Sequence, residues 1–323
     1  MVNKTELTIF IYCLINGELG EGLLGKFVVV PGSSNWLLAY RVASELDAYL
    51  ADVEFKKFPD GEKYVRIVSE VADKRVIIVQ SSALKPDEYL VETFLLADAL
   101  KDLGASYVIL ALAYFPYARQ DERFKPGEAI SLVTVTKLLK NSGVDVLITV
   151  DSHRHRVFDF NDLFGGPVMD VSAMPYLARY ALSTGLIDEE VVVMGPDAEA
   201  EPWAKAAAES IGAREYASLT KRRITSSEVE ITMSRPLDLK NREVLLVDDI
   251  ISTGGTVIEA LKLLKDMGAK DVVVACTHGL FVNNALTRIL KVGVKEIFSS
   301  DTVPNPTTRV SVAPAIAQAV REL

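Results

Sequence analysis

The chain has 323 residues, of which 49% are hydrophobic and 24% charged, a composition that suits about two globular domains and excludes a disordered or fibrous protein. The formal net charge of -9 argues against a general nucleic-acid-binding surface, and it leaves room for small anionic substrates. The two cysteines, Cys13 and Cys276, lie far apart, so they indicate neither a disulfide framework nor a cysteine-rich metal site and fit a reducing cytoplasm.

The first element in chain order is the apolar segment LTIFIYCLI, residues 7–15. A helix needs about 20 apolar residues to cross a bilayer, so this segment does not predict a membrane partner. A secretory signal is not favoured either, because Lys4 is the only basic residue before the segment and no small-residue cleavage site follows it. We expect residues 1–25 to be an N-terminal extension of unknown role, either an extra strand or a misassigned start.

From Lys26 onward, short β-branched runs alternate with amphipathic helical patterns. This alternation predicts an α/β fold in which mostly parallel sheets are flanked by helices. The expected strands are residues 26–30, 63–68, 75–80, 107–113, 145–150, 191–195, 243–249, 271–277 and 295–300. The helical patterns begin at Trp36, Asp87, Ala129, Met174, Ala198, Thr256 and Asn283.

Two stretches of the chain resemble each other. RVIIVQSS and the segment LLADALKDLGASYVILALA (95–113) are echoed by EVLLVDD and the segment EALKLLKDMGAKDVVVACT (259–277). The similarity predicts a duplicated domain, although any two strand-helix-strand units look somewhat alike. We expect an N-terminal domain over residues 26–172 and a C-terminal domain over 173–323, with a helix that crosses between them near the boundary.

The segment VDDIISTGGT, residues 247–256, joins an expected strand to an expected helix. In the first repeat, Gln80 and Ser81 stand where the second has Asp248 and Asp249. Carboxylates can accept hydrogen bonds from sugar hydroxyls, and backbone amides at a helix N-terminus bind phosphate. Ligands of open α/β sheets bind at the carboxyl ends of the strands, where this turn lies. The turn therefore suits a sugar phosphate.

This segment resembles the phosphoribosyl-pyrophosphate binding motif of phosphoribosyltransferases and ribose-phosphate pyrophosphokinases. The resemblance implies that the two acids hold the ribose 2- and 3-hydroxyls and that the Thr-Gly-Gly-Thr turn cradles the 5-phosphate. One departure is a serine where many family members carry another aspartate. The implied ribose 5-phosphate site comprises Asp248, Asp249, Ser252, Thr253, Gly254, Gly255 and Thr256.

Two further segments resemble the pyrophosphokinases alone. In FPDGEKYVRI, residues 58–67, Asp60 and Gly61 form a good hairpin turn, which could be nothing more than a turn. The resemblance implies that this segment completes the ATP base pocket of a neighbouring subunit, and hence a homo-oligomer of two or more subunits. YFPYARQDERFKPGEAIS, residues 114–131, resembles the family's ATP-binding loop; alone it could be a solvated charged loop. The implied ATP residues are Phe58, Asp60, Glu62, Arg119, Gln120, Asp121 and His153.

A possible metal site lies in TVDSHRHRVFDF, residues 149–160. From chemistry alone, Mg²⁺ prefers oxygen ligands, so Asp151 or a zinc site would be the first assignment. The resemblance instead implies that His153 coordinates the Mg²⁺ that accompanies ATP. It also implies an aspartate further along as a second ligand, for which Asp170 is the better candidate and Asp162 the weaker.

The segment SLTKRRITSSEVEI, residues 218–231, contains consecutive cations. Without its context, this run would be a solvated edge. It resembles the family's mobile catalytic loop, and the resemblance implies that Lys221 and Arg223 are the catalytic cations.

The resemblance as a whole implies a cytoplasmic enzyme that transfers the diphosphoryl group of ATP to the C1 hydroxyl of ribose 5-phosphate, giving phosphoribosyl pyrophosphate and AMP. The cofactor would be Mg²⁺, and no nucleic acid partner is expected. The chain has no Gly-x-x-x-x-Gly-Lys-Ser/Thr sequence, so the phosphates would be held by the loops above. The alternatives are a nucleobase phosphoribosyltransferase of salvage and a non-catalytic regulatory protein associated with a synthetase.

Overall fold

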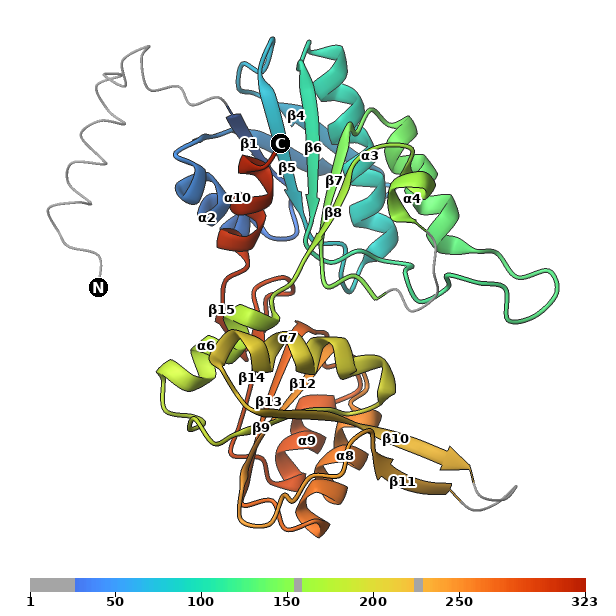
Figure 1. Cartoon of the computed structure of the whole chain (residues 1–323). Coiled ribbons are helices and arrows are strands. Elements are labelled where there is room, and N and C mark those ends of the chain that lie inside the picture. The colour runs from blue at the N-terminus through green and yellow to red at the C-terminus, as the bar shows by residue number, and fades with distance from the viewer. Residues whose placement is uncertain (1–26, 154–158, 224–228) are drawn as a thin grey trace, which may run out of the picture.

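The structure is a computed structural model that describes residues 27–153, 159–223 and 229–323, and of residues 221–231 it describes no side chains. Two large sheets lie one above the other, each flanked by helices (Figure 1). Every strand and helix that the sequence led us to expect from residue 26 onward is present. The predicted α/β fold is confirmed.

The first sheet has six strands in the order β2-β1-β5-β6-β7-β8, and all its neighbouring strands are parallel. Its central strands are continuous runs of Val, Ile and Leu, which is typical of a parallel sheet buried on both faces. The strands are β1 (Phe27–Pro31), β2 (Tyr49–Leu50), β5 (Arg75–Gln80), β6 (Tyr107–Leu112), β7 (Val146–Val150) and β8 (Val168–Val171).

Helices cover both faces of this sheet. Side chains from alternate positions along each strand point to opposite faces, so Val29 and Ile77 pack on α2 while Val28 and Val76 pack in the other core. That second core is completed by three helices on the far face. The helices are α2 (Trp36–Leu46), α3 (Pro86–Asp102), α4 (Ser131–Asn141) and α5 (Phe160–Phe164).

The second sheet has seven strands in the order β11-β10-β9-β12-β13-β14-β15, and only the β10–β11 pair among them is antiparallel. The order β9-β12-β13-β14 repeats the order β1-β5-β6-β7 of the first sheet, so the two sheets have the duplicated topology that the repeat predicted. The strands are β9 (Val192–Gly195), β10 (Glu215–Arg223), β11 (Val229–Met233), β12 (Glu243–Ile251), β13 (Asp271–Gly279), β14 (Glu296–Ser300) and β15 (Thr308–Val310).

The chain crosses between the two sheets at two helices. After β8, helix α6 packs on α7 and β13 of the second sheet, whereas α10 packs back on α2 and β8 of the first sheet (Figure 1). One buried hydrophobic cluster consequently contains residues of both sheets. The helices of this half are α6 (Met174–Ser183), α7 (Glu201–Ile211), α8 (Gly255–Asp266), α9 (Ala285–Val292) and α10 (Ala313–Arg321), with a short 3₁₀ turn η1 (Ala198–Ala200).

A two-stranded antiparallel hairpin projects from the first half. It consists of β3 (Val53–Lys57) and β4 (Lys63–Ile67). The turn is closed by the Phe58 amide, which donates to the Glu62 carbonyl at 2.9 Å, and Gly61 takes φ +99° there. The hairpin expected around Asp60 and Gly61 is thus present. A membrane-spanning helix is absent from the described ranges, since none of their helices combines the needed length with the needed apolar content.

Candidate functional site

The carboxyl ends of the two sheets meet at one junction. His153, after β7, places its Nδ1 2.7 Å from Asp249 Oδ2 at the end of β12. His278, at the end of β13, places its Nε2 2.9 Å from the carbonyl oxygen of Val150. Because ligands of α/β sheets bind outside the carboxyl ends of the strands, this junction is the expected place for a site.

The acidic turn is held in place by its own backbone. The Asp249 amide donates to Asp248 Oδ1 at 3.1 Å, and the Ile250 amide donates to Asp249 Oδ1 at 2.7 Å. Asp249 is buried, and its other oxygen faces His153. Burial of the Asp248 carboxyl, followed by repulsion from Asp249 and Asp197, raises the pKa of Asp248 well above its usual range. The pair would therefore gain from a ligand that donates hydrogen bonds or carries positive charge.

A cavity of about 240 Å³ opens beside this turn. Arg119 and His153 line it from the first sheet, and Asp248 lines it from the second. Helix α8 begins at Gly255, so the amides of its first turn are available at this edge. The remaining residues that line the cavity are Ile250, Ile251, Ser252, Thr253, Gly254, Gly255, Thr256 and Val257.

A second cavity of about 290 Å³ adjoins the first and shares Arg119, His153 and Ile250 with it. Its walls are largely aromatic or apolar, which suits a planar ring, and Gln120 adds a polar group. The residues that line it are Tyr114, Phe115, Tyr117, Ala118, Arg119, Gln120, His153, Ile250 and Leu280. The structure therefore brings the loop at Arg119, the histidine segment and the acidic turn to one place.

Other residues expected at the site lie apart from these cavities. Asp121 is buried and lines neither of the two, and neither do Phe58, Asp60 and Glu62 on the projecting hairpin. Phe58 is 50% exposed. A role for the hairpin in its own chain's cavity finds no support.

The expected second metal ligand, Asp170, is already engaged with its neighbours. Its Oδ1 accepts from the Thr149 hydroxyl at 2.7 Å, and its Oδ2 accepts from the Ser152 hydroxyl at 2.7 Å. These bonds fix the backbone next to His153. The weaker candidate, Asp162, is an exposed residue of α5.

Asp151, which chemistry alone favoured as a metal ligand, has a structural environment. Burial raises the pKa of Asp151 to about 7, against the hydrogen bonds from the Thr277 hydroxyl and the Ala173 amide that lower it. Thr277 belongs to the second sheet, so this carboxyl links the two halves. Within the described ranges, no group of three or more His, Cys, Asp or Glu side chains is arranged to hold a metal ion.

The two expected catalytic cations lie in β10. The backbones of Lys221 and Arg223 pair with Ile231 and Val229 of β11, so they belong to a hairpin rather than to a free loop. Their side chains lie outside the part of the chain that the structure describes.

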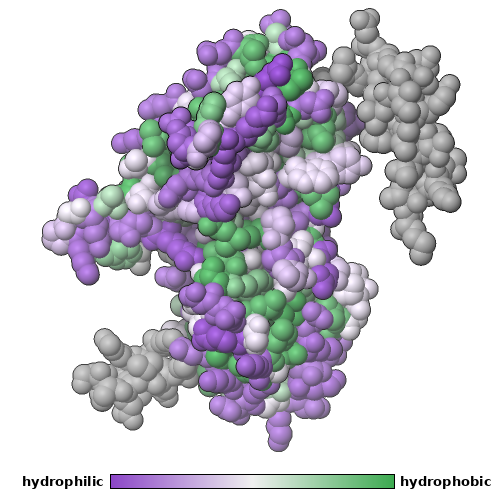
Figure 2. Space-filling model, turned by 180° about the vertical axis from the view of Figure 1, so that it is seen from behind, coloured by the Kyte–Doolittle hydropathy of each residue, from purple (hydrophilic) through white to green (hydrophobic). Residues whose placement is uncertain are grey.

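Sequence reasoning missed the aromatic and apolar walls of the second cavity, formed in part by Tyr114, Tyr117 and Leu280. Tyr114 also contacts His278, with ring centroids 5.0 Å apart in an edge-to-face arrangement. A signal was available, since Tyr114 directly follows the expected strand 107–113 and Leu280 lies three residues after the expected strand 271–277. Figure 2 shows hydrophobic residues gathered at the waist between the two halves on the face drawn there.

Comparison with known proteins identifies both halves. Residues 27–143 match the family model for the N-terminal domain of ribose phosphate pyrophosphokinase. Residues 177–310 match the model for the phosphoribosyl transferase domain. Each half of the duplicated topology is therefore recognised separately.

Whole-chain relatives agree with these matches. The ribose-phosphate pyrophosphokinase of Methanopyrus kandleri is 43% identical over 296 residues, which cover 92% of this chain and 99% of that protein. The ribose-phosphate pyrophosphokinase of Pyrococcus furiosus is 41% identical over 269 residues, covering 83% of this chain and 92% of that protein. The crystal structure of phosphoribosylpyrophosphate synthetase from Mycobacterium smegmatis superimposes with a TM-score of 0.80 at 32% identity, covering 91% of this chain and 97% of that one.

Proposed function

The chain belongs to the ribose-phosphate pyrophosphokinase family, and we propose that it transfers the diphosphoryl group of ATP to the C1 hydroxyl of ribose 5-phosphate, giving phosphoribosyl pyrophosphate and AMP. One observation carries this proposal: adjoining cavities join the loop at Arg119 to the turn at Asp248. We propose two domains: an N-terminal domain over residues 26–172, which carries the ATP loops, and a C-terminal domain over residues 173–323, which carries the ribose 5-phosphate site.

The ribose 5-phosphate would bind along the acidic turn. Asp248 and Asp249 would accept hydrogen bonds from the ribose hydroxyls, and the raised pKa of Asp248 supports a need for such donors. The backbone amides at the start of α8 would hold the 5-phosphate, with Ser252 contributing its hydroxyl. Gly254 at φ +74° opens this turn to close approach by the phosphate.

The ATP would lie in the adjoining cavity. Its phosphates would face Arg119 and His153, which are common to both cavities, and its base would lie against the aromatic wall. Gln120 would contact the nucleotide, while Asp121, which is buried, would support the loop.

The hairpin residues Phe58, Asp60 and Glu62 would reach the ATP base of a neighbouring subunit. Their exposure and their absence from the two cavities of their own chain support this assignment. It requires a homo-oligomer, which the exposed Trp36, Leu37 and Tyr40 on α2 and Val91 and Leu95 on α3 also favour.

The acidic junction fits the magnesium of a metal-nucleotide complex. Mg²⁺ is usually held by one or two protein side chains together with phosphates and water. His153 and Asp170 remain our proposed ligands, and Asp249 of the turn lies beside His153. When bound, Mg²⁺ would neutralise charge that develops on the phosphate oxygens.

The chain's own residues would align the substrates and stabilise negative charge. Transfer of a phosphoryl-type group asks a protein chiefly for alignment and charge neutralisation. The C1 hydroxyl would attack the β-phosphorus, and the oxygen between the α- and β-phosphates would leave with AMP. We propose that Lys221, Arg223 and Arg119 stabilise the charge on these oxygens.

The test is a joint assay of AMP and phosphoribosyl pyrophosphate with ATP, Mg²⁺ and ribose 5-phosphate. Equal amounts of both products, dependent on ribose 5-phosphate, are expected. A salvage phosphoribosyltransferase would instead consume phosphoribosyl pyrophosphate when given a nucleobase, and a regulatory protein would do neither. The comparisons favour neither of these two alternative functions.

A cytoplasmic location remains an expectation from the cysteine usage.

A further inference from the structure

The first half of the chain contains a second copy of the place where the sugar phosphate is proposed to bind. Strand β5 holds the same position in its sheet as β12, and Gln80 and Ser81 stand where Asp248 and Asp249 stand. The turn after β1, which starts at Gly32, corresponds to the turn after β9. In the second half the turn after β12 borders an open cavity. In the first half the corresponding space is filled.

The filling group is the side chain of Gln80. It is fully buried, and its Oε1 accepts hydrogen bonds from the amide and the hydroxyl of Ser34. A side chain on Gly32 would place its Cβ 2.5 Å from Gln80 Oε1, so no room is left between the two turns. A ligand cannot enter this copy of the site without displacing Gln80.

Behind Gln80 lies a fully buried carboxylate, Glu92 of α3. Gln80 Nε2 donates to its Oε1 at 2.8 Å, and the amide and hydroxyl of Ser33 donate to the carboxylate at 2.7 and 2.6 Å. Lys63 Nζ lies 2.5 Å from Oε2 and supplies a positive charge. A buried carboxylate requires such a partner, because the loss of one member of a buried ion pair leaves an uncompensated charge.

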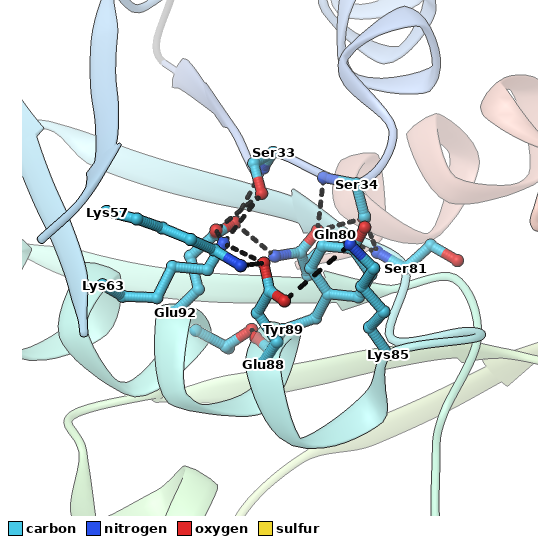
Figure 3. Close-up of polar contacts among 11 residues, drawn as sticks. Ser33, Ser34, Lys57, Lys63, Gln80, Ser81, Lys85, Glu88, Tyr89 and Glu92 are labelled. Carbon is cyan, nitrogen blue, oxygen red and sulfur yellow. Dashed lines mark hydrogen bonds and ion pairs between the residues drawn. The ribbon is translucent and has the colours of Figure 1, made fainter. Parts of the chain in front are cut away.

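Lys63 is the first residue of β4 after the exposed turn of the hairpin. Residues 56–62 are all exposed, whereas the Lys63 side chain is 9% exposed and turns inward (Figure 3). Lys63 Nζ also lies 3.1 Å from Oε1 of Glu88, which belongs to α3 like Glu92. Burial alone would lower the pKa of Lys63, but the hydrogen bonds to Glu92 and Glu88 outweigh it and raise that pKa above its ordinary value.

We propose that the filled copy of the site is an anchor: the Lys63–Glu92 pair fixes the hairpin that presents Phe58, Asp60 and Glu62 to the ATP of a neighbouring subunit. Lys63 and Glu92 are then positioning residues for ATP binding. The inference rests on the proposed function for the role of the hairpin, and on this structure alone for the anchor.

The chain offers a matched control on the same hairpin. Lys57 is the cross-strand partner of Lys63 and also contacts Glu88, at 3.0 Å. Its side chain is 50% exposed, so its ion pair is screened by water and is weak. Lys57→Met and Lys63→Met therefore remove the same charge from the same hairpin, but only Lys63→Met removes the partner of the buried carboxylate.

Two measurements on the full chain test the proposal. In Lys63→Met we expect the KM for ATP to rise about tenfold or more while kcat at saturating ATP changes less than about twofold, because the hairpin would supply binding that is uniform between substrate and transition state. Hydrogen exchange of the hairpin amides should also become faster. In Lys57→Met the KM for ATP and the exchange rates of the hairpin amides should match those of the wild type. The double variant Lys63→Met/Glu92→Gln leaves no unpaired charge and should show the same rise in the KM for ATP. It replaces Lys63→Met in both measurements if Lys63→Met does not fold.

Each outcome decides the proposal. The proposal is overturned if Lys63→Met, or the double variant in its place, has the same KM for ATP and the same exchange rates of the hairpin amides as the wild type. Faster exchange with an unchanged KM would refute the positioning role. If the wild type makes no phosphoribosyl pyrophosphate, the proposed function falls, and the exchange rates alone then support the anchor or reject it.

Discussion

Single residues at the junction acquire their properties from burial. His278 is fully enclosed, and its Nε2 must carry a proton because it faces the carbonyl oxygen of Val150. Its Nδ1 then accepts from the Thr302 hydroxyl, 2.8 Å away. Burial lowers the pKa of His278 to about 4, and the nearby Asp249 opposes that shift only in part. The ring is therefore a neutral link between the two sheets.

This neutral histidine gives the fold a dependence on pH. Between its ordinary pKa of 6.5 and its folded value of about 4, the unfolded chain binds a proton at this ring and the folded chain does not. The free energy of unfolding should therefore fall as the pH falls through that range, by up to about 3 kcal/mol. His278→Gln keeps a donor for Val150 and cannot titrate. Urea unfolding at several pH values should show the stability advantage of the wild type over the variant shrinking toward low pH, and a constant difference would contradict this explanation.

Lys221 is expected to act chiefly in the transition state. Loss of one electrostatic stabiliser typically lowers turnover by about two orders of magnitude or more, so Lys221→Ala should reduce kcat on that scale. The affinity for ATP, measured by equilibrium binding, should change much less. A Lys221→Ala protein with wild-type turnover would exclude the catalytic role.

At the scale of elements, the turn into α8 is where backbone conformation and ligand binding coincide. Gly254 takes φ +74° immediately before the helix, and an added Cβ would lie 3.0 Å from Ile289 Cδ1. Alanine in this left-handed conformation costs about 1–2 kcal/mol before any contact is counted. Glycine at this position therefore meets two requirements, the left-handed backbone conformation and the space next to the Ile289 side chain.

Gly254→Ala should raise the KM for ribose 5-phosphate by about tenfold, because the amides that would hold the phosphate shift when Ile289 is displaced. Gly185→Ala is the control, since Gly185 has φ +72° but nothing within 4 Å of an added Cβ. Both variants should lose stability in thermal unfolding, and Gly254→Ala should lose at least as much as Gly185→Ala because of the added contact with Ile289. Only Gly254→Ala should change the KM, and equal KM values in the two variants would disprove the assignment of the turn.

The sequence predicted the elements that carry strong periodic signals. The central strands are β-branched runs, and both copies of the repeat fold as expected. It missed the C-terminal helix α10 and the strand β2, which has two residues. It also did not list β10, which continues through Lys221 and Arg223, because consecutive polar residues carry little strand signal.

The candidate site was predictable only as separate segments. Arg119, His153 and Asp248 could each be selected from motifs, but their meeting in one cavity depends on how the two sheets face each other. The contact between His153 and Asp249 spans 96 residues of sequence, and no local pattern encodes it. The walls formed by Tyr114 and Leu280 were missed because apolar residues after a strand look like ordinary core.

At the scale of the whole molecule, the junction is held by contacts that link distant parts of the chain. Asn35 donates to the carbonyl oxygen of Asp301 at 2.6 Å, and Arg41 forms an ion pair with the buried Asp301 carboxylate. The Ser81 hydroxyl donates to the carbonyl oxygen of Thr302 at 2.5 Å. Because the two sheets share these bonds and one hydrophobic cluster, we infer that the cavities between them keep a fixed geometry.

The central claim is that this junction aligns ATP and ribose 5-phosphate for transfer of an intact diphosphoryl group. The most direct measurement uses ATP labelled at the β-phosphorus, with ribose 5-phosphate and Mg²⁺, and follows the label in the separated products. We expect all transferred label in phosphoribosyl pyrophosphate and none in the nucleotide product, which would be AMP. Label retained in ADP, or no transfer by a folded protein, would contradict the claim.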